Sequence, residues 1–203
     1  NITDGLEGLI PLDEGGILAS QENLRKAIAY QLSHANDFLK YLYYPVVRPL
    51  SEDDFIDENG EFIVGKEKVF DEEIKDKILY FEKRIPTNNP DSVKACYFTM
   101  DMSCESINGN YAKVNIEMYI MVNEALLSLY DSSSRIARIG IEINKILNLS
   151  IGAFVGELKF KNGYDNYIYT IPDSNSYSEW FAKTDIMLRH IMYNTDSKVN
   201  LLY

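Results

Sequence analysis

Two stretches of the chain, residues 94–105 and 113–123, alternate between apolar and polar side chains. Successive side chains of an extended strand point to opposite faces, so a period of two predicts strands with one buried and one exposed face. The apolar residues are Cys96, Phe98, Met100, Met102 and Cys104 in the first stretch, and Val114, Ile116, Met118, Ile120 and Val122 in the second. The two stretches therefore predict an antiparallel sheet with one face toward the core.

The segment between these strands contains the pair Asn108-Gly109, which is typical of tight hairpin turns. A two-residue turn at this pair places Met102 opposite Asn115, and the apolar residues of the two strands then lie on opposite faces. The faces agree if the loop has an odd number of residues or if a strand carries a bulge. We predict a three-residue loop over residues 108–110, in which Gly109 or Asn110 is left-handed.

The segment that precedes the strands is predicted to be mainly helical. Ser20 is a suitable N-cap for a helix over about residues 20–43, and Pro45 and Pro49 end this helix. A second helix is predicted over about residues 71–84, with acids in its first turn. The apolar stripe is Leu24, Ile28, Leu32, Ala35, Leu39 and Leu42 in the first helix, and Ile74, Ile78, Phe81 and Ile85 in the second.

The chain is predicted to have three parts. Residues 1–19 are rich in Gly, Leu and acids, which predicts an extended arm that becomes ordered against a neighbour. Residues 20–92 form a helical N-terminal region and residues 93–203 an α+β core, with the loop over residues 86–92 as the boundary. The predicted fold class is α+β: antiparallel β-hairpins with helices packed on the sheet, preceded by the helical region and the arm.

A further helix is predicted after the first hairpin. Ser132, Ser133 or Ser134 caps this helix, which reaches about Leu147 and is ended by Asn148. Its isoleucines recur at steps of three and four, which predicts one buried face. The residues of that face are Ile136, Ile139, Ile143, Ile146 and Leu147.

A second hairpin and a final strand are predicted toward the C-terminus. Residues 157–161 and 164–171 flank a turn at residues 161–163 and are predicted to pair with each other. Residues 180–192 alternate loosely and are predicted to form a strand, with a helix over part of the stretch as the alternative. One face of this strand consists of Trp180, Ala182, Thr184, Ile186 and Leu188.

The chain is strongly acidic, with 20 Lys+Arg against 31 Asp+Glu and a formal net charge of −11. Such a surface repels phosphate, so we expect no sequence-specific nucleic-acid binding and no binding to an anionic membrane. A protein that encircles DNA without gripping it remains compatible with this charge. No apolar run approaches the roughly 20 residues that span a bilayer.

The sequence contains no recognisable catalytic centre, cofactor motif or metal site. His34 and His190 lie in no serine or cysteine context, and the segment around Gly60 fails as a calcium loop because two ligand positions lack carboxylates. Cys96 and Cys104 lie too far apart on one strand for a disulfide, so we expect free thiols and folding in a reducing cytoplasm. Their place on the apolar face raises a thiol's pKa, and we expect no enzymatic activity.

The order of hairpin, helix, hairpin and final strand over residues 93–193 matches a known pattern. The stretches that carry it are residues 97–104, 114–122, 134–139, 142–148, 151–152 and 156–160. This pattern resembles the tail-terminator and neck (tail-completion, head–tail connector) proteins of tailed phages. In that family a sheet with helices packed on it forms the protomer of a ring, often a hexamer, between capsid and tail.

The resemblance implies a non-enzymatic structural protein of the virion, assembled in the host cytoplasm, with no catalytic residue, cofactor or metal. Its implied partners are further copies of itself in a ring and other neck, connector or tail-tube proteins. The apolar residues of the arm would add to a neighbour's sheet edge. The residues alone leave two other hypotheses open: a small intracellular acidic binding or adaptor module, and an enzyme with a carboxylate site.

Overall fold

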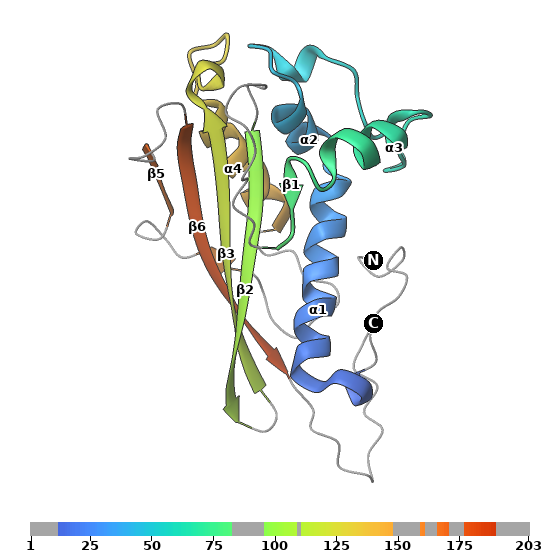
Figure 1. The fold of residues 1–203 in the computed structure, drawn as a ribbon, viewed down its shortest axis with the longest axis vertical. Coiled ribbons are helices and arrows are strands. Elements are labelled where there is room, and N and C mark those ends of the chain that lie inside the picture. The colour runs from blue at the N-terminus through green and yellow to red at the C-terminus, as the bar shows by residue number, and fades with distance from the viewer. Residues whose placement is uncertain are drawn as a thin grey trace.

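A mixed β-sheet with helices packed on one of its faces makes up this α+β protein (Figure 1). The computed structural model describes residues 12–82, 96–108, 111–147, 159–160, 166–170 and 177–189. Side chains are described over residues 21–82, 96–103, 116–123 and 125–147. Within these residues no helix has the length and apolar character needed to cross a bilayer.

The central hairpin consists of β2 (Cys96–Asn108) and β3 (Tyr111–Asn123), as the alternation predicted. Met102 lies opposite Ile116, so the predicted register is confirmed, and the even-numbered residues over 96–102 and 116–122 share the buried face. The predicted three-residue loop is wrong, because Asn108 still pairs with Tyr111. A register shift between Ser106 and Asn108 supplies the extra residue instead, which is the effect of a β-bulge.

The other strands extend this hairpin on both sides. β1 (Leu79–Tyr80) runs parallel to β2, and β6 (Tyr177–Arg189) runs antiparallel to β3, which confirms the predicted final strand. β4 (Lys159–Phe160) and β5 (Asn166–Thr170) both pair with β6, so the predicted hairpin between them is wrong. The long edge of β6 offers backbone partners to both short segments, which leaves fewer unpaired groups than a separate hairpin would.

The first predicted helix is longer at its start and interrupted near its end. α1 (Leu12–Ser33) begins eight residues before Ser20, so the prediction of an extended arm is wrong over residues 12–19, whereas residues 1–11 lie outside the described ranges. Ala35 adopts an extended conformation, and α2 (Asn36–Tyr43) follows it. This break changes the direction of the chain while the apolar stripes of both helices still reach the core.

The predicted helix over residues 71–84 is wrong. The chain forms the single turn α3 (Lys66–Val69), the π-helical turn η2 (Phe70–Ile74) and then strand β1. Asp76 has a φ of 62°, which ends the helical conformation. Strand pairing is favoured over a longer helix here because it buries Leu79 beside β2. The amide of Phe98 also donates to the carbonyl of Ile78 at 2.8 Å.

The helix α4 (Arg135–Leu147) confirms the prediction for this segment, with Ile136, Ile139, Ile143 and Leu147 fully buried. Short 3₁₀ turns, η1 (Pro49–Ser51) and η3 (Glu124–Leu126), lie in the loops after α2 and β3. One hydrophobic core joins residues of α1, α2, α4 and the even-numbered face of the sheet. The core is thus continuous across the predicted boundary at residues 86–92, which itself lies outside the described ranges.

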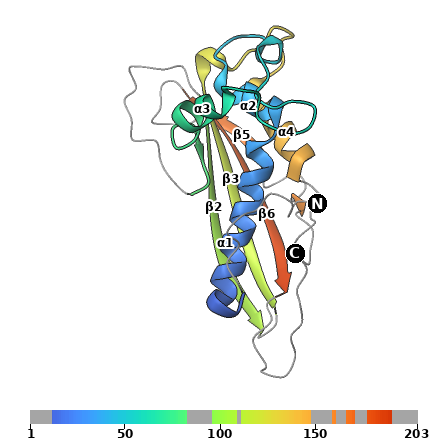
Figure 2. The same ribbon diagram turned by 90° about the vertical axis from the view of Figure 1, so that its right-hand side faces the viewer.

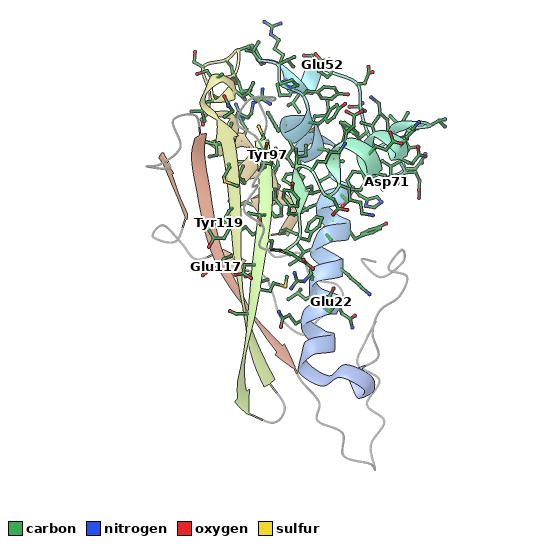
Figure 3. All side chains as sticks on the ribbon, viewed as in Figure 1. Glu22, Glu52, Asp71, Tyr97, Glu117 and Tyr119 are labelled. Atoms are coloured by element: carbon green, nitrogen blue, oxygen red, sulfur yellow. The ribbon has the colours of Figure 1, made fainter. Side chains whose placement is uncertain are left out.

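The odd-numbered residues over 97–103 and 117–123 lie on the other face of the sheet. Tyr97, Glu117 and Tyr119 are on this face and are half-buried (Figure 3). The hydroxyl of Tyr119 donates to the carboxylate of Glu117 at 2.8 Å. These tyrosines therefore act as ordinary residues of a half-buried sheet face.

Candidate functional site

Arg135, the first residue of α4, is only 1% exposed although it carries a charge. Its Nε donates to the carbonyl of Leu126 at 2.9 Å, and its Nη1 donates to the carbonyls of Tyr41 and Tyr44 at 2.9 and 3.0 Å. Its Nη2 donates to the carbonyl of Val46. Within the described residues, the hydrogen bonds of this guanidinium all go to main-chain carbonyls.

This arrangement joins the start of α4 to the end of α2 and to the turn η3. The last carbonyls of α2 have no helical partner, and they carry the negative end of the helix dipole. Arg135 supplies both the missing donors and a positive charge, and it also holds the turn η3 through Leu126. Burial lowers the pKa of Arg135, but a guanidinium retains its proton in proteins. We call Arg135 and the main-chain carbonyls that it binds, those of Tyr41, Tyr44, Val46 and Leu126, the interior seam.

Exposed apolar side chains lie directly outside this seam. Val47 is 58% exposed and Tyr130 is 63% exposed, although each belongs to a loop that the seam fixes. The amide of Tyr130 donates to the carbonyl of Val47 at 3.1 Å, which joins the two loops. The guanidinium of Arg48 lies 4.5 Å from the centre of the Tyr130 ring, within cation–π distance. We call Val46, Val47, Arg48, Leu50 and Tyr130 the tip surface.

The tip surface contains a pocket of about 220 Å³. Its apolar lining comes from both loops and from the helix behind them: Tyr41, Val47, Pro49, Leu50, Leu129 and Tyr130. Arg138 lies at the same pocket and pairs with Asp131 at 3.1 Å. Hydrogen bonds from Ser133, and then the charge of Arg138, lower the pKa of Asp131, so this carboxylate is ionised at neutral pH.

A second apolar feature projects from the segment between η1 and α3. Val64 is 96% exposed, and its neighbour Ile63 is also exposed. The turn before them is well ordered by hydrogen bonds, because the carboxylate of Asp57 accepts from the amides of Asn59 and Glu61 at 2.8 and 2.9 Å. These bonds, the one from Glu61 above all, lower the pKa of Asp57. We call residues 57–65 the protruding turn.

Glycine is required at two places in the protruding turn. Gly60 and Gly65 have φ values of 85° and 87°, which side chains other than glycine rarely adopt. The amide of Ile63 donates to the carbonyl of Phe55 at 2.9 Å, and Ile56 forms a bridge with Phe62. The turn is therefore anchored to the buried Phe55 and Ile56 while its own apolar side chains face outward.

A larger pocket of about 400 Å³ lies between α1, the protruding turn and β1. Its wall is aromatic: the ring of Tyr30 stacks on that of His34 at 4.1 Å, and Phe62 lies 5.3 Å from His34. Nδ1 of His34 lies 2.8 Å from the carbonyl of Tyr30. Among the described residues no group of His, Cys, Asp and Glu has the arrangement of a metal site. His190 lies outside the described ranges.

The thiol of Cys96 is fully buried on the core face of β2. Burial raises its pKa to about 12, so the thiol is protonated at neutral pH and is a poor nucleophile. This agrees with the prediction that the apolar face makes this cysteine unreactive. The side chain of Cys104 lies outside the described ranges.

An ion pair links α2 to the acidic segment over residues 52–54. The ammonium of Lys40 is buried and lies 2.7 Å from the carboxylate of Asp54, which is half-exposed. Asn36 also donates to Asp54, at 2.8 Å. The hydrogen bond from Lys40, followed by that from Asn36, lowers the pKa of Asp54. This pair was missed because Lys40 occupies a position that reads as an exposed helix residue.

The outer edge of β2 pairs with a described strand only near its start. β1 pairs only with Phe98 and Thr99. From Met100 to Asn108 no described strand lies on this side of β2 (Figure 1). A side chain of α1 reaches this stretch, because the amide of Gln21 donates to the carbonyl of Met102 at 3.2 Å.

The fold and these surfaces define an α+β protein whose exposed apolar side chains lie mainly in the tip surface and the protruding turn. A family model described as YomW matches residues 35–194, which include α2, α4 and the whole described sheet. The chain therefore belongs to the YomW family, which is phage-derived. This confirms the phage origin that the resemblance implied. None of the curated proteins and none of the solved structures that were compared matches the chain.

Proposed function

We propose that this protein is a non-enzymatic structural subunit of a phage particle, and that it forms a homo-oligomeric ring in the neck or tail terminator that joins capsid to tail. The observation that carries the proposal is the position of its exposed apolar side chains. Of the seven exposed large hydrophobic side chains among the described residues, six belong to the tip surface and the protruding turn. These six are Val46, Val47, Leu50, Ile63, Val64 and Tyr130.

Such a grouping favours a protein that binds other proteins. Single exposed apolar residues are common, but apolar residues gathered in neighbouring loops are typical of interaction surfaces. Arg135 holds the loops of the tip surface through main-chain bonds, so little conformational entropy is lost when a partner binds. A preformed surface of this kind suits a subunit that assembles in a fixed geometry.

The sheet edge and the charge support the same proposal. The edge of β2 beyond Thr99, where no described strand lies, suits pairing with a strand of a neighbouring subunit or of another neck, connector or tail-tube protein. The net charge of −11 suits a ring through which DNA passes without sticking, because like charges repel. The phage-derived family is consistent with assembly in the host cytoplasm and a final place in the virion.

The proposal is tested on particles of the phage that encodes the chain. We expect mass spectrometry to find the protein in purified particles and immunogold labelling to place it at the junction of head and tail. Disruption of the gene should yield full-sized heads and tails that remain unjoined, and expression of the chain from a plasmid should restore joining. A matched control expresses a chain with Ile141→Asp, because Ile141 is the exposed apolar residue outside both surfaces.

Absence of the protein from purified particles contradicts the proposal. In that case a soluble complex with a host or phage protein in infected cells would favour the alternative, a small acidic binding or adaptor module. Label distributed over the whole capsid or along the whole tail would contradict the ring at the junction while retaining a structural role.

A further inference from the structure

We propose that copies of this chain join head to tail, with Ile63 and Val64 of one copy inserted into the pocket of the tip surface of the next. The inference rests on the proposed function as a ring subunit and identifies the contact that would build the ring. Both halves of the contact belong to the same chain and both are exposed.

Both halves offer apolar side chains. The protruding turn presents two adjacent aliphatic side chains, and Val64 has almost no contact with its own chain. The pocket of about 220 Å³ is open to the surface and has an apolar lining that includes Val47, Leu50 and Tyr130. Insertion would remove apolar surface of both copies from water, which is the main favourable contribution to such contacts.

The two halves also match in charge. Among the described residues Arg48 forms no ion pair, and its guanidinium lies over the exposed ring of Tyr130 at the pocket. The protruding turn carries the exposed acids Glu58 and Glu61 next to its apolar residues. Arg138 and Asp131 also lie at the pocket, but they neutralise each other. A copy that docks its acidic turn here would thus meet a cation.

The two halves are formed by different segments of the chain. The tip surface includes part of η1, which Glu52 follows, and the protruding turn comes directly before α3, which ends shortly before Asp71. Figure 3 labels Glu52 and Asp71. In Figure 2, α3 lies on one side of α2 and α4 lies on the other. A contact between two different patches leaves one patch free on each copy, so the same contact repeats and gives a ring when the rotation closes.

Both halves are held in shape before they meet. Arg135 fixes the main chain of residues 41–46, and Asp57 organises the protruding turn through the amides of Asn59 and Glu61. The contact therefore needs little rearrangement, which favours association of rigid surfaces. The copies repel each other through their net charge of −11, so the contact should strengthen when salt screens this repulsion.

The experiment measures the molar mass of the purified chain by light scattering over a wide range of protein concentration, at moderate salt. We expect the wild-type chain to assemble as its concentration rises. Val64→Asp and Val47→Asp should each raise the dissociation constant about tenfold or more, since each places a charge in an apolar contact. Ile141→Asp, the same kind of change at an exposed residue outside both surfaces, should leave assembly unchanged.

Mixing the two variants gives the decisive result. The Val64→Asp chain retains its pocket and the Val47→Asp chain retains its protruding turn, so the mixture should form a 1:1 dimer and nothing larger. Assembly of either variant at the wild-type level overturns the inference, and so does a mixture that stays monomeric. A wild-type chain that is monomeric at every concentration also overturns it. The particle experiment then decides the proposed function separately, because labelling at the head–tail junction does not depend on this contact.

Discussion

The interior seam around Arg135 and the tip surface around Arg48 use the same short segments of chain in opposite ways. In the seam a buried guanidinium is satisfied by main-chain carbonyls. At the tip surface an exposed guanidinium lies over an exposed tyrosine ring. Val46 belongs to both regions, because its carbonyl accepts from Arg135 while its side chain is exposed.

The two regions differ in whether their side chains contribute to stability or are available for binding. A buried polar group must keep its partners, since an unsatisfied one costs about 1–3 kcal/mol. An exposed apolar group has no such requirement and is available to contact another protein. Substitutions in the seam should therefore act on the free energy of unfolding, and substitutions at the tip surface should act on assembly.

The largest expected effect is that of Arg135→Met on stability. The change leaves the carbonyls of Leu126, Tyr41, Tyr44 and Val46 without their donor, and we expect a loss of about 3–5 kcal/mol in the free energy of unfolding. Urea unfolding followed by circular dichroism measures this loss.

Arg135→Lys is the matched control for this change. It keeps the charge but offers fewer donors in a different geometry, so it should lose less stability than Arg135→Met. An unfolding midpoint of Arg135→Met equal to that of the wild type would show that the seam does not stabilise the fold, and the comparison would fail.

A smaller effect is expected for Asp54→Ala, which changes a residue outside both regions. The change removes the partner of the buried Lys40, and because Asp54 is half-exposed we expect a loss of only about 1 kcal/mol at neutral pH. Hydrogen bonds lower the pKa of Asp54, so the folded state favours the carboxylate. This contribution is complete above the usual range of an aspartate pKa and is lost as pH falls through the folded value.

Urea midpoints measured from neutral to acid pH check this prediction. The difference between the wild type and Asp54→Ala should shrink as pH falls. A difference that stays constant down to acid pH would mean that the carboxylate charge is not the source of the stabilisation. Asp53→Ala is a suitable control, because Asp53 is exposed and lies 3.6 Å from Lys66, which is itself partly exposed.

The smallest effect on stability is expected for Tyr130→Ala at the tip surface. Its ring is 63% exposed, and its cation–π contact with Arg48 is worth about 0.5–1 kcal/mol at an exposed site. Urea unfolding should therefore change little, whereas assembly measured by light scattering should weaken. A loss of stability as large as that of Arg135→Met would show that the tip surface is part of the structural framework.

Much of the fold was predictable because its signals are local. The alternation in β2 and β3 predicted the strands and the pairing of Met102 with Ile116, and the isoleucines of α4 predicted its buried face. The errors lie where local signals compete with distant partners. Leu79 lies within the stretch that was predicted to be helical, but it pairs beside Phe98 in the sheet. β4 and β5 pair with β6 rather than with each other for the same reason.

The candidate site was much less predictable. Arg135 and Arg138 read as two polar positions on one amphipathic helix, and nothing in their neighbourhood distinguishes the buried one from the exposed one. Val64 reads as an ordinary apolar residue near a glycine, and it becomes a surface feature only because its turn is held outward by Asp57 and Phe55.

The sequence by itself determined the periodic elements, because side-chain direction along a strand or helix follows from backbone geometry alone. It also determined the acidic character of the chain. Only the tertiary structure decided which arginine is buried, which apolar residues remain exposed and which segments pair with β6. Each of these depends on a hydrogen-bond partner or a packing neighbour far away in the chain, and in the seam that partner is the end of α2, about ninety residues before Arg135.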